Sequence, residues 1–208
     1  MKALTWHGKN DIRCDSVPDP KIQHGRDAII KVTACAICGS DLHYFQHGGF
    51  GTVRVKQPMV LGHEVSGVVA EVGAAVRSIQ AGTRISISPS RPCGHCAYCQ
   101  KGQHNHCLNM RFYGSAMPWP HIQGAFSEQV VIESHQAHPI GDHLSLSQAA
   151  LDHHAVAVTD APVAWRAVDV EALLPTREFL GADVEREFVD ELAVDLAGVE
   201  RIVGALPS

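Results

Sequence analysis

Four cysteines in one short stretch constrain this chain more than any other feature. They occupy positions 93, 96, 99 and 107 within the sequence CGHCAYCQKGQHNHC. A Cys-x-x-Cys step lets two thiolates on one tight turn reach the same ion, and thiolates are favourable ligands of Zn²⁺. Gly94 and Gly102 permit the backbone turns that this convergence needs. Four thiolates leave no open coordination position, so we predict a structural zinc site within a lobe at residues 91–109, with the ligands Cys93, Cys96, Cys99 and Cys107.

Two alternatives to the zinc site are disulfide bonds and four unrelated free thiols. The first residues, MKALTWHGKNDIRCDS, contain no apolar core of a signal peptide. We therefore expect a cytoplasmic protein, and in that reducing compartment seven cysteines favour metal binding over disulfides. No apolar run approaches the roughly 18 residues that a membrane-spanning helix needs.

Composition and charge favour a soluble globular protein with a small-molecule ligand. Of the 208 residues, 45% are hydrophobic, which is enough for a packed core. The net charge is −5 and the basic residues are scattered, which argues against a nucleic-acid interface or a polybasic membrane patch.

Short apolar and β-branched runs, separated by glycine, proline and aspartate, predict a β-rich domain over residues 1–151. After Gly39, we expect Ser40 or Asp41 to cap a short helix. The expected strands lie at residues 2–6, 28–33, 65–73, 83–87, 127–132 and 137–140.

The composition changes abruptly after residue 151. Residues 1–151 carry 13 Lys and Arg against 10 Asp and Glu, whereas residues 152–208 carry 4 against 12. Apolar residues in this acidic tail recur at spacings of three or four, which predicts a partly helical segment with one apolar face. That face favours ordinary packing, and whether the tail is folded stays open. Its members are Val184, Phe188, Leu192, Leu196, Val199, Val203 and Leu206.

A second constellation has the chemistry of a catalytic metal site. Cys38, His63 and Glu64 offer sulfur, nitrogen and oxygen ligands, and three protein ligands leave a fourth position on zinc for water or a substrate oxygen. Taken alone the pattern is weak, because a buried cysteine and a surface histidine are each commoner than metal ligands.

Three motifs, in this order along the chain, resemble the zinc-dependent medium-chain alcohol dehydrogenases. They are CGSDLHY at residues 38–44, PMVLGHE at residues 58–64 with its following glycines, and PCGHCAYC at residues 92–99. These motifs, with MRFYGSAM at residues 110–117, are most similar to the polyol and sugar-acid branch, which includes L-idonate 5-, sorbitol and xylitol dehydrogenases. The resemblance covers residues 1–151.

The resemblance implies a GroES-like barrel, mainly β with some α structure. It implies one catalytic zinc on Cys38, His63 and Glu64, and one structural zinc on the lobe cysteines. Ser40, His43 or Tyr44 would pass the proton of the alcohol to solvent. The implied reaction oxidises the secondary alcohol of a small polyol or sugar acid with NAD(P), because zinc lowers the pKa of a bound alcohol and a nicotinamide accepts its hydride. Whether the chain forms a homo-oligomer stays open.

The sequence departs from this family after Leu151. No Gly-x-Gly-x-x-Gly turn occurs in residues 152–208, so we expect the Rossmann domain that binds NAD(P) to be absent from this chain. The Glu-Pro pair of the family is replaced by Asp152, His153 and His154, and either histidine is a candidate fourth zinc ligand. The alternatives are a truncated dehydrogenase and a zinc-binding remnant or interaction module without turnover.

Overall fold

The computed structural model describes residues 1–151, and the predicted acidic helical tail lies outside the described residues. The described part is mainly β, and all of its strand pairs are antiparallel. None of its helices is long and apolar enough to cross a membrane.

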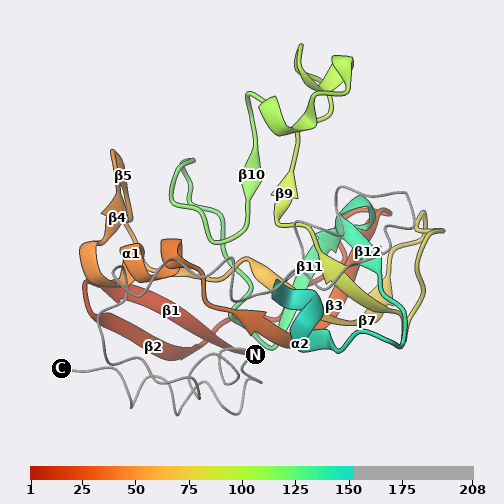
Figure 1. Cartoon of the computed structure of the whole chain (residues 1–208), viewed down its shortest axis with the longest axis horizontal. Helices are drawn as coiled ribbons and strands as arrows, with labels where there is room; N and C mark the ends of the chain where they lie inside the picture. The colour runs from red at the N-terminus through yellow and green to blue at the C-terminus, as the bar shows by residue number, and fades with distance from the viewer. Residues whose placement is uncertain (152–208) are drawn as a thin grey trace.

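The largest sheet has five strands, and Figure 1 shows it on the right. Its middle strands are rich in valine and isoleucine, whose branched side chains pack well on a pleated surface. One face of this sheet covers a core of buried aliphatic side chains that includes Ile30, Val69 and Ile85. In spatial order the strands are β11 (Gln129–Glu133), β3 (Asp27–Ala36), β7 (Glu64–Val72), β8 (Arg84–Ile87) and β12 (Ala137–Pro139).

A second sheet of three strands lies beside the first. It is built from the hairpin of β1 and β2 together with β6. Its core packs Trp6, Met59 and Phe126 around Tyr44 of the first helix. A backbone hydrogen bond of 2.8 Å from the N–H of Leu4 to the carbonyl oxygen of Phe126 ties this sheet to the segment before β11. The strands are β1 (Lys2–Gly8), β2 (Asp11–Ser16) and β6 (Met59–Val60).

The remaining elements are short. Two further sheets have two strands each, and two α-helices and three 3₁₀ turns complete the described chain. Helix α2 contacts β3, β7 and β8, and the hydroxyl of Ser86 in β8 donates a hydrogen bond of 2.9 Å to the carbonyl oxygen of Ala149. The elements are α1 (Gly39–His47), β4 (Gly49–Phe50), β5 (Val53–Arg54), β9 (Ser90–Arg91), η1 (Cys99–Lys101), η2 (His104–His106), β10 (Arg111–Phe112), η3 (Ser134–Gln136) and α2 (Leu146–Leu151).

All six strands expected from the sequence are present, with ends that differ by at most three residues. The predicted cap of the first helix was wrong. Cys38 occupies the N-cap position, with φ −85° and ψ 154°, and Ser40 and Asp41 lie inside the first turn of α1. Cysteine is not among the usual capping residues, which is why the pattern favoured serine or aspartate.

Candidate metal centres

The cysteine lobe projects away from the two sheets on a stalk formed by β9 and β10 (Figure 1). The turns η1 and η2 lie within the lobe and bring Cys107 back to the first three cysteines. Gly94 and Gly102 have φ angles of +76° and +73°, so they adopt the left-handed backbone that the sequence led us to expect. The lobe therefore owes its shape to tight turns and to its four sulfur atoms.

The four lobe cysteines fit a zinc ion. Their sulfur atoms all lie within 4.8 Å of one another. A tetrahedral zinc ion with Zn–S bonds of about 2.3 Å separates its sulfurs by roughly 3.8 Å, so only small adjustments are needed. The backbone N–H of Cys93 also donates a hydrogen bond of 3.2 Å to Sγ of Cys107, which joins the two ends of the lobe.

The lobe thiols have very different pKa values. Backbone N–H donation from His95 lowers the pKa of Cys93 to about 6, whereas burial and the neighbouring sulfurs raise the pKa of Cys99 to about 12. Four sulfurs in this small volume cannot all be thiolates without a compensating cation. A divalent ion supplies that charge and favours the deprotonated form of each ligand.

The second site forms because of the register between β3 and β7. Ala36, the last residue of β3, lies opposite Glu64, the first residue of β7. Cys38 follows this pair by two residues on one side, and His63 precedes it by one on the other. The ligand atoms of Cys38, His63 and Glu64 consequently lie within 4.8 Å of one another, which brings together the three residues predicted from the sequence.

Asp41 holds the two halves of this site together. One carboxylate oxygen accepts a hydrogen bond of 3.0 Å from the backbone N–H of Cys38, and the other accepts one of 3.2 Å from the backbone N–H of Gly62. The second oxygen is also 3.9 Å from Nδ1 of His63. Asp41 is buried, with 3% of its surface exposed, so these contacts are shielded from water.

The electrostatics of the site favour a thiolate. A hydrogen bond with His63 lowers the pKa of Cys38, and the hydroxyl of Ser40 contributes in the same direction. Burial works to lower the pKa of His63, but the contacts with Cys38 and Asp41 outweigh burial and raise it. Burial raises the pKa of Asp41. A metal ion would take the place of the proton shared within this group.

The three predicted relay residues have different surroundings. Ser40 lies beside the sulfur of Cys38. His43 is exposed on α1, and its ring is 5.7 Å from that of His47. Tyr44 is buried with 3% exposure, and its hydroxyl accepts a hydrogen bond of 3.2 Å from the backbone N–H of Ala116. A role in proton transfer stays a prediction for all three, and His153 and His154 lie outside the described residues.

Two features of the site did not emerge from the sequence. The bridging role of Asp41 depends on the backbone N–H of Gly62, which is distant in sequence. The ring of Phe112 at the base of the lobe lies 5.4 Å from the ring of His63, so the stalk packs against the second site. An acidic residue three positions after a helix cap is a recognisable signal, but a cysteine at the cap obscured it.

Comparison with known proteins identifies the family. Residues 24–142, more than half of the chain, match the alcohol dehydrogenase GroES-like domain. The chain belongs to this family. Its fold is therefore the expected GroES-like one.

Relatives of the chain include polyol and sugar-acid dehydrogenases. The chain is 37% identical to sorbitol dehydrogenase of Bacillus subtilis over 151 residues, which are 73% of this chain and 41% of that protein. It is 45% identical to L-idonate 5-dehydrogenase (NAD(P)(+)) of Escherichia coli over 111 residues, which are 53% of this chain and 32% of that protein.

Solved structures agree with the sequence comparison. The crystal structure of L-idonate 5-dehydrogenase from Escherichia coli matches with a TM-score of 0.63 and 36% identity, over 69% of this chain and 40% of that one. This GroES-like chain thus spans about two fifths of the length of its sorbitol dehydrogenase relative and of this solved structure.

Proposed function

We propose that residues 1–151 form the zinc-binding catalytic domain of an oxidoreductase that acts on the secondary alcohol of a polyol or sugar acid, with NAD(P) as hydride acceptor. The observation that best supports this proposal is the convergence of Cys38, His63 and Glu64 within 4.8 Å in a domain similar to those of sorbitol and L-idonate dehydrogenases. Three ligands of this kind leave a position for a substrate oxygen, which a structural site does not.

The residues of the site have separable roles in this proposal. Cys38, His63 and Glu64 would hold zinc, and the bound ion would act as a Lewis acid that lowers the pKa of an alcohol and favours loss of hydride from its carbon. Asp41 fixes the backbone at Cys38 and Gly62 and thereby orients two of the ligands.

The proton of the alcohol needs a separate route to solvent. Ser40 lies beside Cys38, so its hydroxyl can take the proton at short range. His43 is exposed on the same helix and can release it to water. The lobe cysteines hold the second zinc, which stabilises the lobe without taking part in the reaction.

A second candidate is a zinc-binding domain without turnover. It is favoured by the sequence of residues 152–208, which contains no Gly-x-Gly-x-x-Gly turn to receive the pyrophosphate of NAD(P). In the first candidate, the cofactor site must come from other residues or from another chain.

Substitution of zinc by Co²⁺ tests the proposal without depending on the cofactor. Thiolate-bound Co²⁺ absorbs visible light, and its bands respond to a new oxygen ligand. We expect sorbitol or L-idonate at millimolar concentration to shift these bands saturably, and the shift to be absent from the Cys38→Ser variant, whose lobe still binds Co²⁺. If neither compound shifts the bands of the Co²⁺-loaded wild-type protein, the proposed alcohol site is wrong.

Adding NAD⁺ or NADP⁺ to the zinc-loaded protein then separates the two candidates. Steady formation of NADH or NADPH from a polyol supports the dehydrogenase. Polyol binding without reduction of the cofactor is what we expect of this chain alone, because hydride transfer needs the nicotinamide held roughly 3–3.5 Å from the reacting carbon.

A further inference from the structure

A cavity of about 620 Å³ lies at the base of the cysteine lobe, where the stalk meets the large sheet. None of Cys38, His63 and Glu64 lines this cavity, so it is separate from the proposed alcohol site. Cavities of roughly 300–1,000 Å³ are the usual size for small-molecule ligands. The volume is therefore sufficient for a small organic molecule.

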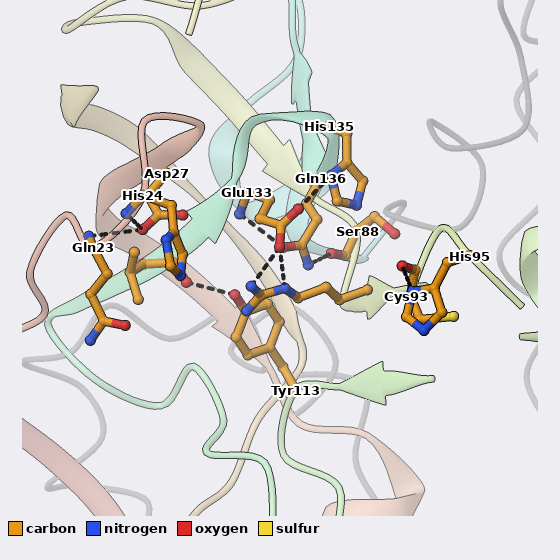
Figure 2. Close-up of polar contacts among 12 residues, drawn as sticks. Gln23, His24, Asp27, Ser88, Cys93, His95, Tyr113, Glu133, His135 and Gln136 are labelled. Atoms are coloured by element: carbon orange, nitrogen blue, oxygen red, sulfur yellow. Dashed lines mark hydrogen bonds and ion pairs between the residues drawn. The ribbon is translucent and has the colours of Figure 1, made fainter. Parts of the chain in front are cut away.

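The charged side chains that line the cavity are three arginines and one glutamate. They are Arg26, Arg91, Arg111 and Glu133. Glu133 already has a partner, because it accepts a hydrogen bond of 2.6 Å from Nε of Arg91 and forms a second contact with the same guanidinium group. Nδ1 of His135 is 3.4 Å from the other carboxylate oxygen of Glu133. The backbone N–H of Glu133 donates a hydrogen bond of 3.0 Å to the side-chain oxygen of Gln136, as Figure 2 shows. The glutamate therefore offsets only one of the three positive charges.

The other two guanidinium groups have no ion pair and no side-chain hydrogen bond within residues 1–151. Arg111 lies directly opposite Arg91 in the pairing of β10 with β9, so the two like charges share one face of the stalk. Like charges directly opposite each other on paired strands are destabilising, and Glu133 offsets the charge of Arg91 only. Arg26 comes from the segment just before β3 and reaches the same cavity.

The positive charges of Arg91 and Arg26 act on the neighbouring side chain of His135. The pKa of His135 is lowered first by burial and then, against the opposing effect of Glu133, by Arg91 and Arg26. The arginines are thus close enough to act on one imidazole ring.

Apolar side chains complete the wall. Met110, Leu108 and Met117 border the cavity, and Leu108 and Met117 are 68% and 74% exposed there, so their apolar surface is open to a ligand. Methionine adapts its shape to varied apolar partners, and a guanidinium group offers paired N–H donors that match a carboxylate or a phosphate. The lining therefore has a polar part for an anionic group and an apolar part for the rest of a ligand.

We propose that this cavity binds a small organic anion, whose carboxylate or phosphate group is held by Arg26 and Arg111 and whose apolar body packs on Met110 and Met117. The competing explanation is that the arginines only balance the negative charge of a metal-bound thiolate shell, since Cys93 also borders the cavity. The two explanations differ in whether the arginines affect ligand binding or zinc retention.

Calorimetric titration of the zinc-loaded full chain at low salt tests the assignment. The probes are phenyl phosphate and phenylacetate, which share an aromatic body and differ in the anionic group, with inorganic phosphate and phenol as half-probes. We expect saturable binding of at least one of the two full probes, and the tighter one identifies the preferred anion. Absence of saturable binding of both would overturn the proposal, and affinity for inorganic phosphate equal to that for phenyl phosphate would overturn the role of the apolar wall.

Arginine variants locate the site. Arg26→Gln and Arg111→Gln should each weaken binding about tenfold or more, because a hydrogen bond to a charged group is lost. Arg54→Gln is the matched control, since Arg54 lies on the distant β4–β5 hairpin and bonds only to carbonyl oxygens of its own turn (Figure 1). Equal losses in all three variants would contradict the proposal. Unchanged probe binding together with loss of zinc from the lobe in Arg26→Gln and Arg111→Gln would also contradict it. That result is expected if the arginines only balance the charge of the zinc-bound thiolates.

Discussion

Replacement of Gly62 by alanine should damage both the fold and the second metal site. Gly62 has a φ of +90°, and a Cβ placed on it would lie 2.4 Å from Cδ1 of Phe126. The Phe126 ring is only 8% exposed and is packed in the core of the smaller sheet, so it cannot swing aside freely. Gly62 also donates its N–H to Asp41 and immediately precedes His63.

The expected cost has two parts. Left-handed backbone in a residue other than glycine costs about 1–3 kcal/mol, and overpacking a filled core costs about 1–3 kcal/mol more. Gly82 provides a matched control, because its φ is +87° and a Cβ there would meet no atom within 4 Å. Gly82→Ala should therefore cost only the backbone part, and Gly62→Ala should exceed it by about 1–3 kcal/mol.

Urea unfolding of the zinc-loaded proteins measures both costs, provided that the slope of the transition is the same for each variant. Competition with a chelator measures the affinity of the more labile zinc, which should fall in Gly62→Ala and not in Gly82→Ala. If Gly62→Ala costs no more than Gly82→Ala, the contact with Phe126 is not the reason for glycine at this position.

Two other substitutions test single contacts. Asp41→Asn should weaken binding of the labile zinc by about 10–100-fold in a chelator competition, because the carboxylate that orients Cys38 and His63 is lost, and unaltered affinity would contradict that role. Burial raises the pKa of Tyr113 to about 12 from the usual 10, so the folded chain holds the phenolic proton more tightly than the unfolded chain does. The protonated hydroxyl therefore stabilises the fold below pH 10, and this stabilisation is lost as the pH rises to 12. Relative to Tyr113→Phe, the wild type should lose about 2–3 kcal/mol of unfolding free energy between pH 10 and pH 12. If the unfolding free energies of the two proteins change with pH in parallel, the hydroxyl of Tyr113 is not the cause.

The sequence predicted those parts of the fold that depend on local composition. Runs of valine and isoleucine located the strands of the large sheet, since branched side chains favour a pleated and half-buried surface. The strand β2 was missed because its sequence, DIRCDS, is mostly polar and lies at the edge of its sheet. Two-residue strands such as β9 and β10 exist only through a partner about twenty residues away, which no local pattern reveals.

The candidate metal-ligating residues were predictable from the sequence because metal coordination uses few residue types. The geometry around them was not, since it depends on the register of β3 against β7 and on the carboxylate of Asp41. The surroundings of Tyr44 also depend on a contact between segments far apart in the sequence. Its position in the sequence suggested a proton relay, whereas the structure places its hydroxyl against the backbone of Ala116 in the core.

We propose that this chain holds two zinc ions of different kinds, and metal analysis before and after mild chelation tests this proposal most directly. A closed thiolate shell exchanges its ion less readily than an open site, so we predict one retained zinc and one released zinc per chain. The variant Cys38→Ser should keep only the retained ion, and the double variant Cys96→Ser, Cys99→Ser only the released one. Zinc content that is unchanged in the double variant would contradict the account.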